Sequence, residues 1–180
     1  RAGPSLMFPG GELDQAGREQ LADVLGESPE TTISVHVLRR GLCRAWVAGG
    51  LPHLAAAIVQ TDDLPGEPMG FGTDARVLWS LLQGVVGWFC VDVSPEVAMP
   101  LGNILQAETG QLVRYYGDVH HVLRRPARAF RHPAARLLTS EDTSLLAEAP
   151  RELQGAGFGG PRAMLAEGVV AGAFMDGRIV

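Results

Sequence analysis

Signals that begin helices alternate along this chain with short apolar runs suited to strands. The triplets Ser28-Pro29-Glu30 and Ser94-Pro95-Glu96 each present a capping hydroxyl, a proline that fits the first helical turn and an acid at the positive end of the helix dipole. Apolar periodicity predicts further helices over residues 14–25 and from Thr73 onward. Because strand-like runs lie between these helices, the order predicts a mixed α/β fold.

Strands are expected between the helices. The alternation of Ile33, Val35 and Val37 also suits a strand, but the preceding helix start and the Arg39-Arg40-Gly41 stop signal favour a helix there. The expected strands cover residues 44–48, 53–60, 87–93, 112–116 and 119–123. Gly49-Gly50 is placed to join the first two strands as a hairpin.

The pattern changes near residues 126–133, which are rich in Arg, Pro and Ala and mark a predicted boundary between domains 1–130 and 131–180. The second domain is expected to contain a short strand over 136–139, a helix capped by Ser140-Glu141-Asp142 and reaching about Gln154, a glycine-rich loop over 155–160, a short helix from Pro161 and an apolar strand over 169–174. Asp176-Gly177 then predicts a hairpin leading into Arg178-Ile179-Val180. No internal repeat is expected.

Charge and composition exclude several classes of protein. All 15 basic residues are arginine, and a chain without lysine cannot be a Schiff-base or pyridoxal-phosphate enzyme, a Walker-type NTPase or a protein kinase. A net charge of −5 and a pI near 5.5 indicate no nucleic-acid partner. The local cluster Arg124, Arg125, Arg128 and Arg131 is interpreted as a solvated loop, with an anion contact as the alternative. No apolar run reaches the roughly 18 residues of a membrane span, so no membrane partner is expected.

The cysteines and the first residue bear on the compartment. Cys43 and Cys90 lie in apolar stretches, and two thiols without a leader predict reduced, buried residues of a cytoplasmic protein. The chain begins at Arg1 without a basic and apolar leader, which indicates a trimmed or partial polypeptide.

Three patterns are candidate sites, but none of them predicts one. Residues 155–160 spell Gly-x-Gly-x-x-Gly, yet a helix end precedes them and a short helix follows, so they are interpreted as a connection between helices. His120 and His121 are adjacent on an expected strand and point to opposite faces, so they cannot share a metal ion. Pairing of Cys43 with His36 or His53 as nucleophile and base has no local support.

The remaining polar and aromatic residues have structural explanations. The paired acids Asp62-Asp63 and Glu141-Asp142 are expected in a turn and in a helix cap, and no Gly-x-Ser-x-Gly motif indicates a serine hydrolase. The large aromatics follow the expected strands and helix, which predicts core or interface anchors, with the lining of a ligand pocket as the alternative. These aromatics are Trp46, Trp79, Trp88, Tyr115 and Tyr116.

From about Tyr115 onward, the sequence resembles bacterial members of the GNAT superfamily of acyl-CoA-dependent N-acetyltransferases that carry an extra N-terminal domain. The resemblance rests on Arg136-Leu137-Leu138-Thr139 followed by an acidic capped helix, on the segment 159–168, and on the run 169–180 with its Asp176-Gly177 turn. In this family a first strand and helices lead to a strand, a short turn and another strand. The first domain would then be GNAT-like or accessory.

The resemblance implies acetyl-CoA as co-substrate of the complete enzyme and a small-molecule amine or peptide as acceptor. The family's pyrophosphate-binding signature, Arg or Gln followed by x-x-Gly-x-Gly or Ala, comes after its fourth strand, and for the domain over 131–180 that strand lies beyond position 180. The family's fourth-strand acid and later tyrosine lie beyond it too, so no catalytic, cofactor-binding or metal residue is carried over. The chain is therefore expected to be an N-terminal portion that is inactive alone and binds no cofactor.

Two other interpretations stay open. A non-catalytic α/β binding or dimerisation module is one, and a homodimer is an expected assembly for it, because an unfinished hairpin at Ile179-Val180 leaves an unpaired strand edge. A small-molecule sensor that uses the aromatic residues is the other.

Overall fold

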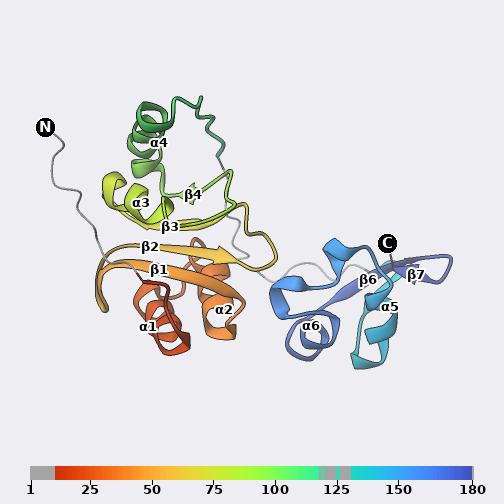
Figure 1. The fold of residues 1–180 in the computed structure, drawn as a ribbon. Helices are drawn as coiled ribbons and strands as arrows, with labels where there is room; N and C mark the ends of the chain where they lie inside the picture. The colour runs from red at the N-terminus through yellow and green to blue at the C-terminus, as the bar shows by residue number, and fades with distance from the viewer. Residues whose placement is uncertain (1–10, 118, 120–124, 126–130, 180) are drawn as a thin grey trace, which may run out of the picture. The chain divides into compact units, whose positions relative to one another are not determined.

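The computed structural model describes residues 11–117, 119, 125 and 131–179. The chain divides into two compact units, residues 1–120 (unit 1) and 121–180 (unit 2). Both units combine helices with a sheet (Figure 1), so the predicted mixed α/β class is confirmed.

Unit 1 is built on a sheet with the strand order β1-β2-β3-β4. Its elements are α1 (Gln15–Leu25), α2 (Thr32–Arg40), β1 (Cys43–Gly50), β2 (His53–Thr61), β3 (Met69–Gly72), α3 (Ala75–Leu82), β4 (Asp92–Val93) and α4 (Pro95–Thr109). The first two pairings are antiparallel and the third is parallel. The segment before α1 joins the sheet too, because Glu12 pairs antiparallel with Trp46 and the Leu13 N–H donates to the Ala45 carbonyl at 2.8 Å.

Each face of this sheet forms a core of its own, because successive side chains of a strand point to opposite faces. Ala45 and Val47 pack with buried residues of α1 and α2. Trp46 and Ala48, on the opposite face, pack with buried residues of α3 and α4. Helices therefore cover both faces of unit 1, with α1 and α2 on one side and α3 and α4 on the other (Figure 1).

The helix starts in unit 1 agree with the predictions at α1 and α4, whereas α2 and α3 begin later than predicted, α3 at Ala75 rather than Thr73. α1 and α4 begin directly after Asp14 and Ser94, as predicted. α2 begins at Thr32, later than the Ser28-Pro29-Glu30 signal predicts. That signal builds a turn instead, because the Thr31 hydroxyl accepts the Ser28 N–H at 2.9 Å and so holds the triplet outside the helix.

The β1–β2 hairpin is confirmed, although its turn is Leu51-Pro52 rather than Gly49-Gly50. The short strand β3 is missing from the predictions, because two of its four residues are glycines and glycine disfavours strands. Gly72 is required there: its φ is +136°, and a Cβ at this position would lie 2.8 Å from the Ala55 carbonyl oxygen.

Two predicted strands of unit 1 are wrong. The strand over 87–93 shrinks to β4, and residues 112–116 form no strand. Tyr115 lies against α4 instead, at a place where Gly102 leaves room, since a side chain at 102 would overlap the tyrosine hydroxyl. Of the predicted strand over 119–123, Val119 is in no strand and the rest lies outside the described residues.

Unit 2 is smaller and has the strand order β5-β6-β7, with antiparallel pairing throughout. Its strands and α-helices are β5 (Ala135–Leu137), α5 (Thr143–Ala147), α6 (Pro161–Glu167), β6 (Ala171–Met175) and β7 (Arg178–Ile179), and its 3₁₀ turns are η1 (Ser140–Asp142), η2 (Arg151–Leu153) and η3 (Ala156–Phe158). The hairpin at Asp176-Gly177 and the helix from Pro161 are confirmed. The predicted helix to about Gln154 is wrong, because Pro150 cannot continue a helical hydrogen-bond ladder and α5 ends at Ala147.

The structure of unit 2 repeats the opening part of unit 1, against the expectation of no internal repeat. In each unit an extended segment leads to two helices, a strand, a tight turn and a second strand. Equivalent residues are 125 positions apart: Glu12 pairs with Trp46 as Leu137 pairs with Ala171, and the hairpin pair Gly50–His53 corresponds to Met175–Arg178.

Backbone hydrogen bonds and buried side chains follow the same spacing. The Leu13 N–H bond to Ala45 has its counterpart in the Leu138 N–H, which donates to the Val170 carbonyl at 2.8 Å. Leu21 in α1 and Leu146 in α5 are equivalent, and both are buried. Cores need matching volume more than identical residues, so few identities mark the repeat in the sequence.

Candidate functional site

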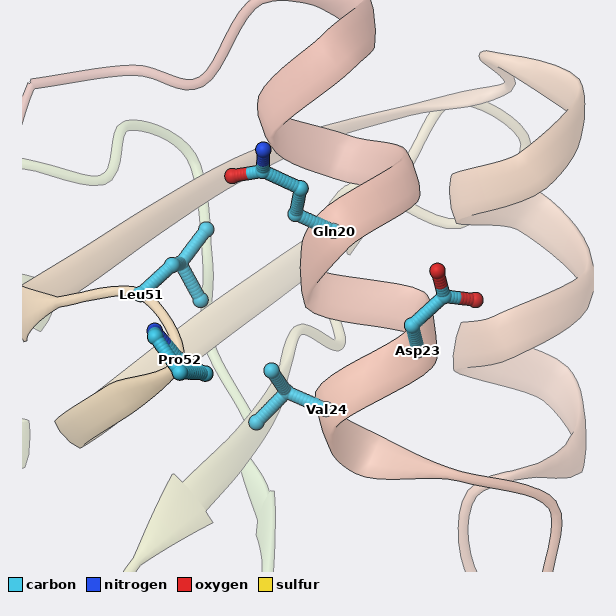
Figure 2. Close-up of a pocket in the computed structure, with 5 residues that line it drawn as sticks. All are labelled: Gln20, Asp23, Val24, Leu51 and Pro52. Carbon is cyan, nitrogen blue, oxygen red and sulfur yellow. The ribbon is translucent and has the colours of Figure 1, made fainter.

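A shallow hollow of about 260 Å³ lies between α1 and the turn from β1 to β2. Figure 2 shows Gln20 and Val24 on the side of α1 that faces Leu51 and Pro52, with Asp23 at the rim. Three of these five residues are apolar, and the Asp23 carboxylate lies 3.7 Å from the Arg39 guanidinium.

The hollow does not have the chemistry of an active site. Small-molecule sites usually enclose roughly 300–1,000 Å³ and bring several polar groups together on the ligand. This hollow is smaller, and Asp23, its one charged residue, belongs to an exposed ion pair with Arg39. It suits the packing of an apolar side chain.

Helix starts are the second place to look, since their free N–H groups bind phosphate. In α3 the Asp74 Oδ1 accepts the N–H groups of Arg76 and Val77 at 2.8 and 3.3 Å. In α1 the Asp14 Oδ1 accepts the Gly17 N–H at 2.8 Å. Carboxylates of the chain thus occupy donors that a phosphate would need, and their charge repels anions.

The start of α4 is acidic as well. Glu96 lies in its first turn, and hydrogen bonds from its own backbone N–H and from the Ser94 side chain hold the pKa of this carboxyl below its usual value. A carboxylate that stays ionised at this helix end again disfavours a bound anion. The helix starts of α1, α3 and α4 therefore do not fit the pyrophosphate of acetyl-CoA.

The glycine-rich loop over 155–160 connects helical segments, as predicted. A 3₁₀ turn, η2, precedes it in place of the strand that a dinucleotide site requires. Its amides bond within the loop, since the N–H groups of Phe158 and Gly160 both donate to the Gly155 carbonyl at 2.9 Å. Gly155 has a φ of +71°, and a side chain there would overlap Met164 of α6.

The candidate thiol is a core residue. Cys43 is buried between the sheet and the α1–α2 layer, and burial raises the pKa of its thiol to about 12. A nucleophilic cysteine needs a lowered pKa. His53 lies at the opposite end of the hairpin, paired with Gly50, whereas Cys43 pairs with Thr61. Cys43 is therefore no activated nucleophile, and it forms no disulfide with Cys90.

The paired acids have structural roles. Asp62 and Asp63 lie exposed after β2, and Asp142 caps the start of the helical segment in unit 2, both as predicted. Within the residues that the structure describes, no group of three or more His, Cys, Asp or Glu side chains is placed to hold a metal ion. His120, His121, Arg124 and Arg128 lie outside the described residues.

The tryptophans are anchors, as predicted. Trp46 is 7% exposed and stacks under the Arg44 guanidinium at 4.8 Å. The indole N–H groups of Trp79 and Trp88 donate to the Glu108 carboxylate at 2.7 Å and to the Leu82 carbonyl at 3.1 Å. Tyr116 is 80% exposed, so it is no core anchor, and an interface role for it stays a prediction.

Two functional features were missed in the sequence. The first is the Asp74 cap of α3, which was missed because the predicted helix starts at Thr73. The signal that could have identified this cap is an aspartate directly before an apolar periodic run. The second is an apolar, exposed sheet face in unit 2, for which the alternation Ala171, Ala173 and Met175 is the signal.

Comparisons with protein-family models, with curated proteins and with solved structures find no match to this chain. In the described part of the chain, every helix is too short or too polar to cross a membrane.

Proposed function

We propose that this chain is the N-terminal portion of a GNAT-like N-acetyltransferase, which transfers an acetyl group from acetyl-CoA to a small-molecule amine or a peptide. One observation carries the proposal. In unit 2, β5 leads through α5 and α6 to β6, and the Asp176-Gly177 turn leads on to β7. This is the order of strand, helices, strand, turn and strand that the resemblance over residues 131–180 implies.

The repeat extends the proposal to unit 1. With the Glu12 segment counted as a first strand, unit 1 opens in the same order and adds β3 as a fourth strand, followed by α3. The family's phosphate-binding amides would lie after this strand, where Asp74 occupies the N–H groups. Residues 67–72 come nearest to the signature, but Glu67 replaces its Arg or Gln, and both glycines lie inside β3.

Unit 1 is therefore assigned an accessory role. β3 contains no acid that would deprotonate an amine, and the helix starts do not fit the donor's phosphates. We infer that the described residues lack an acetyl-CoA site, and no transfer step is assigned to them. We infer that the donor site belongs to a longer polypeptide that continues unit 2. The buried thiol of Cys43, which forms no disulfide, supports a cytoplasmic location for it.

The test compares residues 1–180 with the longer natural polypeptide. Each is incubated with acetyl-CoA and a panel of primary amines and peptides, and released CoA thiol is measured. We expect transfer by the longer polypeptide and none by residues 1–180. A longer polypeptide that neither binds nor consumes acetyl-CoA would overturn the acetyltransferase assignment, and transfer by residues 1–180 alone would overturn its status as an incomplete portion.

A non-catalytic binding module is the second candidate. The observation in its favour is the exposed apolar sheet face of unit 2, on which Leu137 and Met175 are each 64% exposed. Exposed apolar faces mark surfaces that bind another protein segment or a ligand.

A further inference from the structure

One face of the unit 2 sheet is apolar and exposed. On antiparallel partners, side chains opposite each other share a face, and the pairs Ala135–Ala173 and Leu137–Ala171 are both exposed. Met175 continues this face at the end of β6. We call these five residues the open face. The residues between them face α5 and α6, where Phe174 packs with a buried cluster that includes Leu138 and Leu146.

The repeat identifies what covers this face in unit 1. At the spacing of 125 residues, Ala171 and Ala173 correspond to Trp46 and Ala48. Trp46 and Ala48 are buried, and they pack with residues of α3 and α4 such as Leu78 and Leu101. At Ala171 and Ala173, the open face of unit 2 is therefore the face that α3 and α4 cover in unit 1. Glu12 and Gly50, the equivalents of Leu137 and Met175, are exposed in unit 1, so the rim of the face stays open there.

The shape and charge of the open face suit a helix. Three of its five residues are alanines, which let a helix backbone approach closely, and the larger Leu137 and Met175 flank them. Arg178 pairs with Met175 at the rim, is exposed, and forms no ion pair within the described residues. A cation at this position favours an acidic side chain or the negative C-terminal end of a helix.

We propose that the open face is the docking surface of one amphipathic helix, which the longer polypeptide supplies after β7. The occupant carries an aliphatic stripe that packs on the alanines and an acidic residue or helix C-terminus beside Arg178. Chain order supports this source, since unit 1 covers the equivalent face with α3, which begins at Ala75, shortly after β2 ends at Thr61. The inference rests on the proposed function only for the existence of a longer polypeptide.

A second copy of the chain is the weaker occupant. Stable interfaces bury roughly 20 or more residues on each side, whereas the open face has five residues, three of them alanine. A face of this size is closed by one helix.

The test measures how accessible the open face is to a thiol reagent. Single cysteines replace Ala171 or Ala173, whose equivalents Trp46 and Ala48 are buried, in a C90S background, both in residues 1–180 and in the longer polypeptide. Glu141→Cys is the matched control, because Glu141 is exposed at the start of η1 and lies outside the open face. We expect A171C and A173C to react about tenfold more slowly, or slower still, in the longer polypeptide, with E141C unchanged.

Each other outcome overturns the proposal. Equal rates at 171 and 173 in the two polypeptides mean that no segment covers the face, and a natural polypeptide that ends at residue 180 has none to supply. Protection that rises with the concentration of residues 1–180 assigns the face to a second copy. The acetyl-transfer assay is read separately, so protection without transfer leaves the docking inference standing while it overturns the proposed function.

A second variant guards against misfolding of the cysteine variants. Ala173→Asp places a charge at the centre of the open face, where it is solvated in residues 1–180 and buried under a docked helix. We expect the melting temperature to fall in the longer polypeptide and to stay unchanged in residues 1–180. Equal melting temperatures for wild type and A173D in the longer polypeptide would contradict the docked helix.

Discussion

The Arg136 guanidinium donates two hydrogen bonds to the Asp142 carboxylate, from Nη1 to Oδ2 at 2.8 Å and from Nη2 to Oδ1 at 2.6 Å. The same carboxylate accepts the Thr139 N–H at 2.8 Å, and the guanidinium lies 4.7 Å from the centre of the Phe174 ring. This one contact joins the start of η1 to β5 and to β6, so it holds the small sheet of unit 2 to its helical layer.

The pair predicts a loss of stability in acid. The Arg136 hydrogen bond, and after it the Thr139 N–H, hold the pKa of Asp142 well below its ordinary value of 3.8. The stabilisation is therefore present above the unfolded-state pKa and is lost as the pH falls below about 4 toward the folded-state pKa. We expect the Thr139 and Gly172 amides to lose hydrogen-exchange protection over that range.

Asp142→Asn separates this contact from general acid unfolding. In this variant the free energy of unfolding of unit 2 should be lower at neutral pH and should no longer fall as the solution is acidified. Glu141→Gln, at the exposed neighbouring position, should behave as wild type. An unchanged pH profile in D142N would show that the pair does not stabilise unit 2.

Equivalent leucines of the two units should cost a similar free energy of unfolding when each is replaced by alanine. Leu21 is 0% and Leu146 2% exposed, so Leu21→Ala and Leu146→Ala each open a cavity. The expected cost is about 2–5 kcal/mol, confined to the unit that carries the change. Leu64→Ala, at a half-exposed position, should stay within about 0.5 kcal/mol. Denaturant unfolding followed by NMR in each unit checks this, and a neutral L146A would contradict the repeat.

Asp74 should stabilise α3 as a cap. Replacement by Ala removes the acceptor for the Arg76 and Val77 N–H groups and should cost about 1 kcal/mol in the unfolding of unit 1. Asp74→Asn keeps an acceptor and should keep most of this stability. Thermal unfolding of the two variants separates the outcomes, and equal losses in D74A and D74N would mean that charge, rather than capping, is what matters.

Cys43 should be inert in the folded chain. Its thiol is buried with a pKa near 12, so little thiolate is present at pH 8. In a C90S background we expect no reaction with an aromatic disulfide reagent at pH 8, and stoichiometric reaction after addition of guanidinium chloride. Rapid labelling of the native protein would show an accessible thiolate and reopen its assignment as a core residue.

Local signals predicted the elements that depend on local chemistry. Asp14, Ser94 and Asp176-Gly177 mark two helix starts and a hairpin correctly, because caps and turns act within a few residues. The strand predicted over residues 112–116 is wrong, because strand propensity does not reveal that Tyr115 packs against Gly102 of α4. The strand β3 was not predicted, because its two glycines have low strand propensity. They suit a close approach to β2 that only the tertiary fold creates.

The candidate site depends on long-range relationships of the same kind. The spacing of 125 residues appears in strand register and in burial, while equivalent positions such as Trp46 and Ala171 differ in residue type. The open face needs the register of β5 against β6 before its five residues become one surface. Sequence patterns alone identify the alternation but not the missing cover.

Calorimetric titration of acetyl-CoA into residues 1–180 tests whether these residues form folded units without a complete acyl-donor site. Because the Asp74 and Asp14 carboxylates occupy the N–H donors at the starts of α3 and α1, we predict no saturable heat for residues 1–180 up to about millimolar acetyl-CoA. We predict saturable binding by the longer polypeptide. Acetyl-CoA at 100 times its dissociation constant should raise the free energy of unfolding of that polypeptide by about 2.7 kcal/mol. Saturable, stoichiometric binding of acetyl-CoA by residues 1–180 would contradict the account.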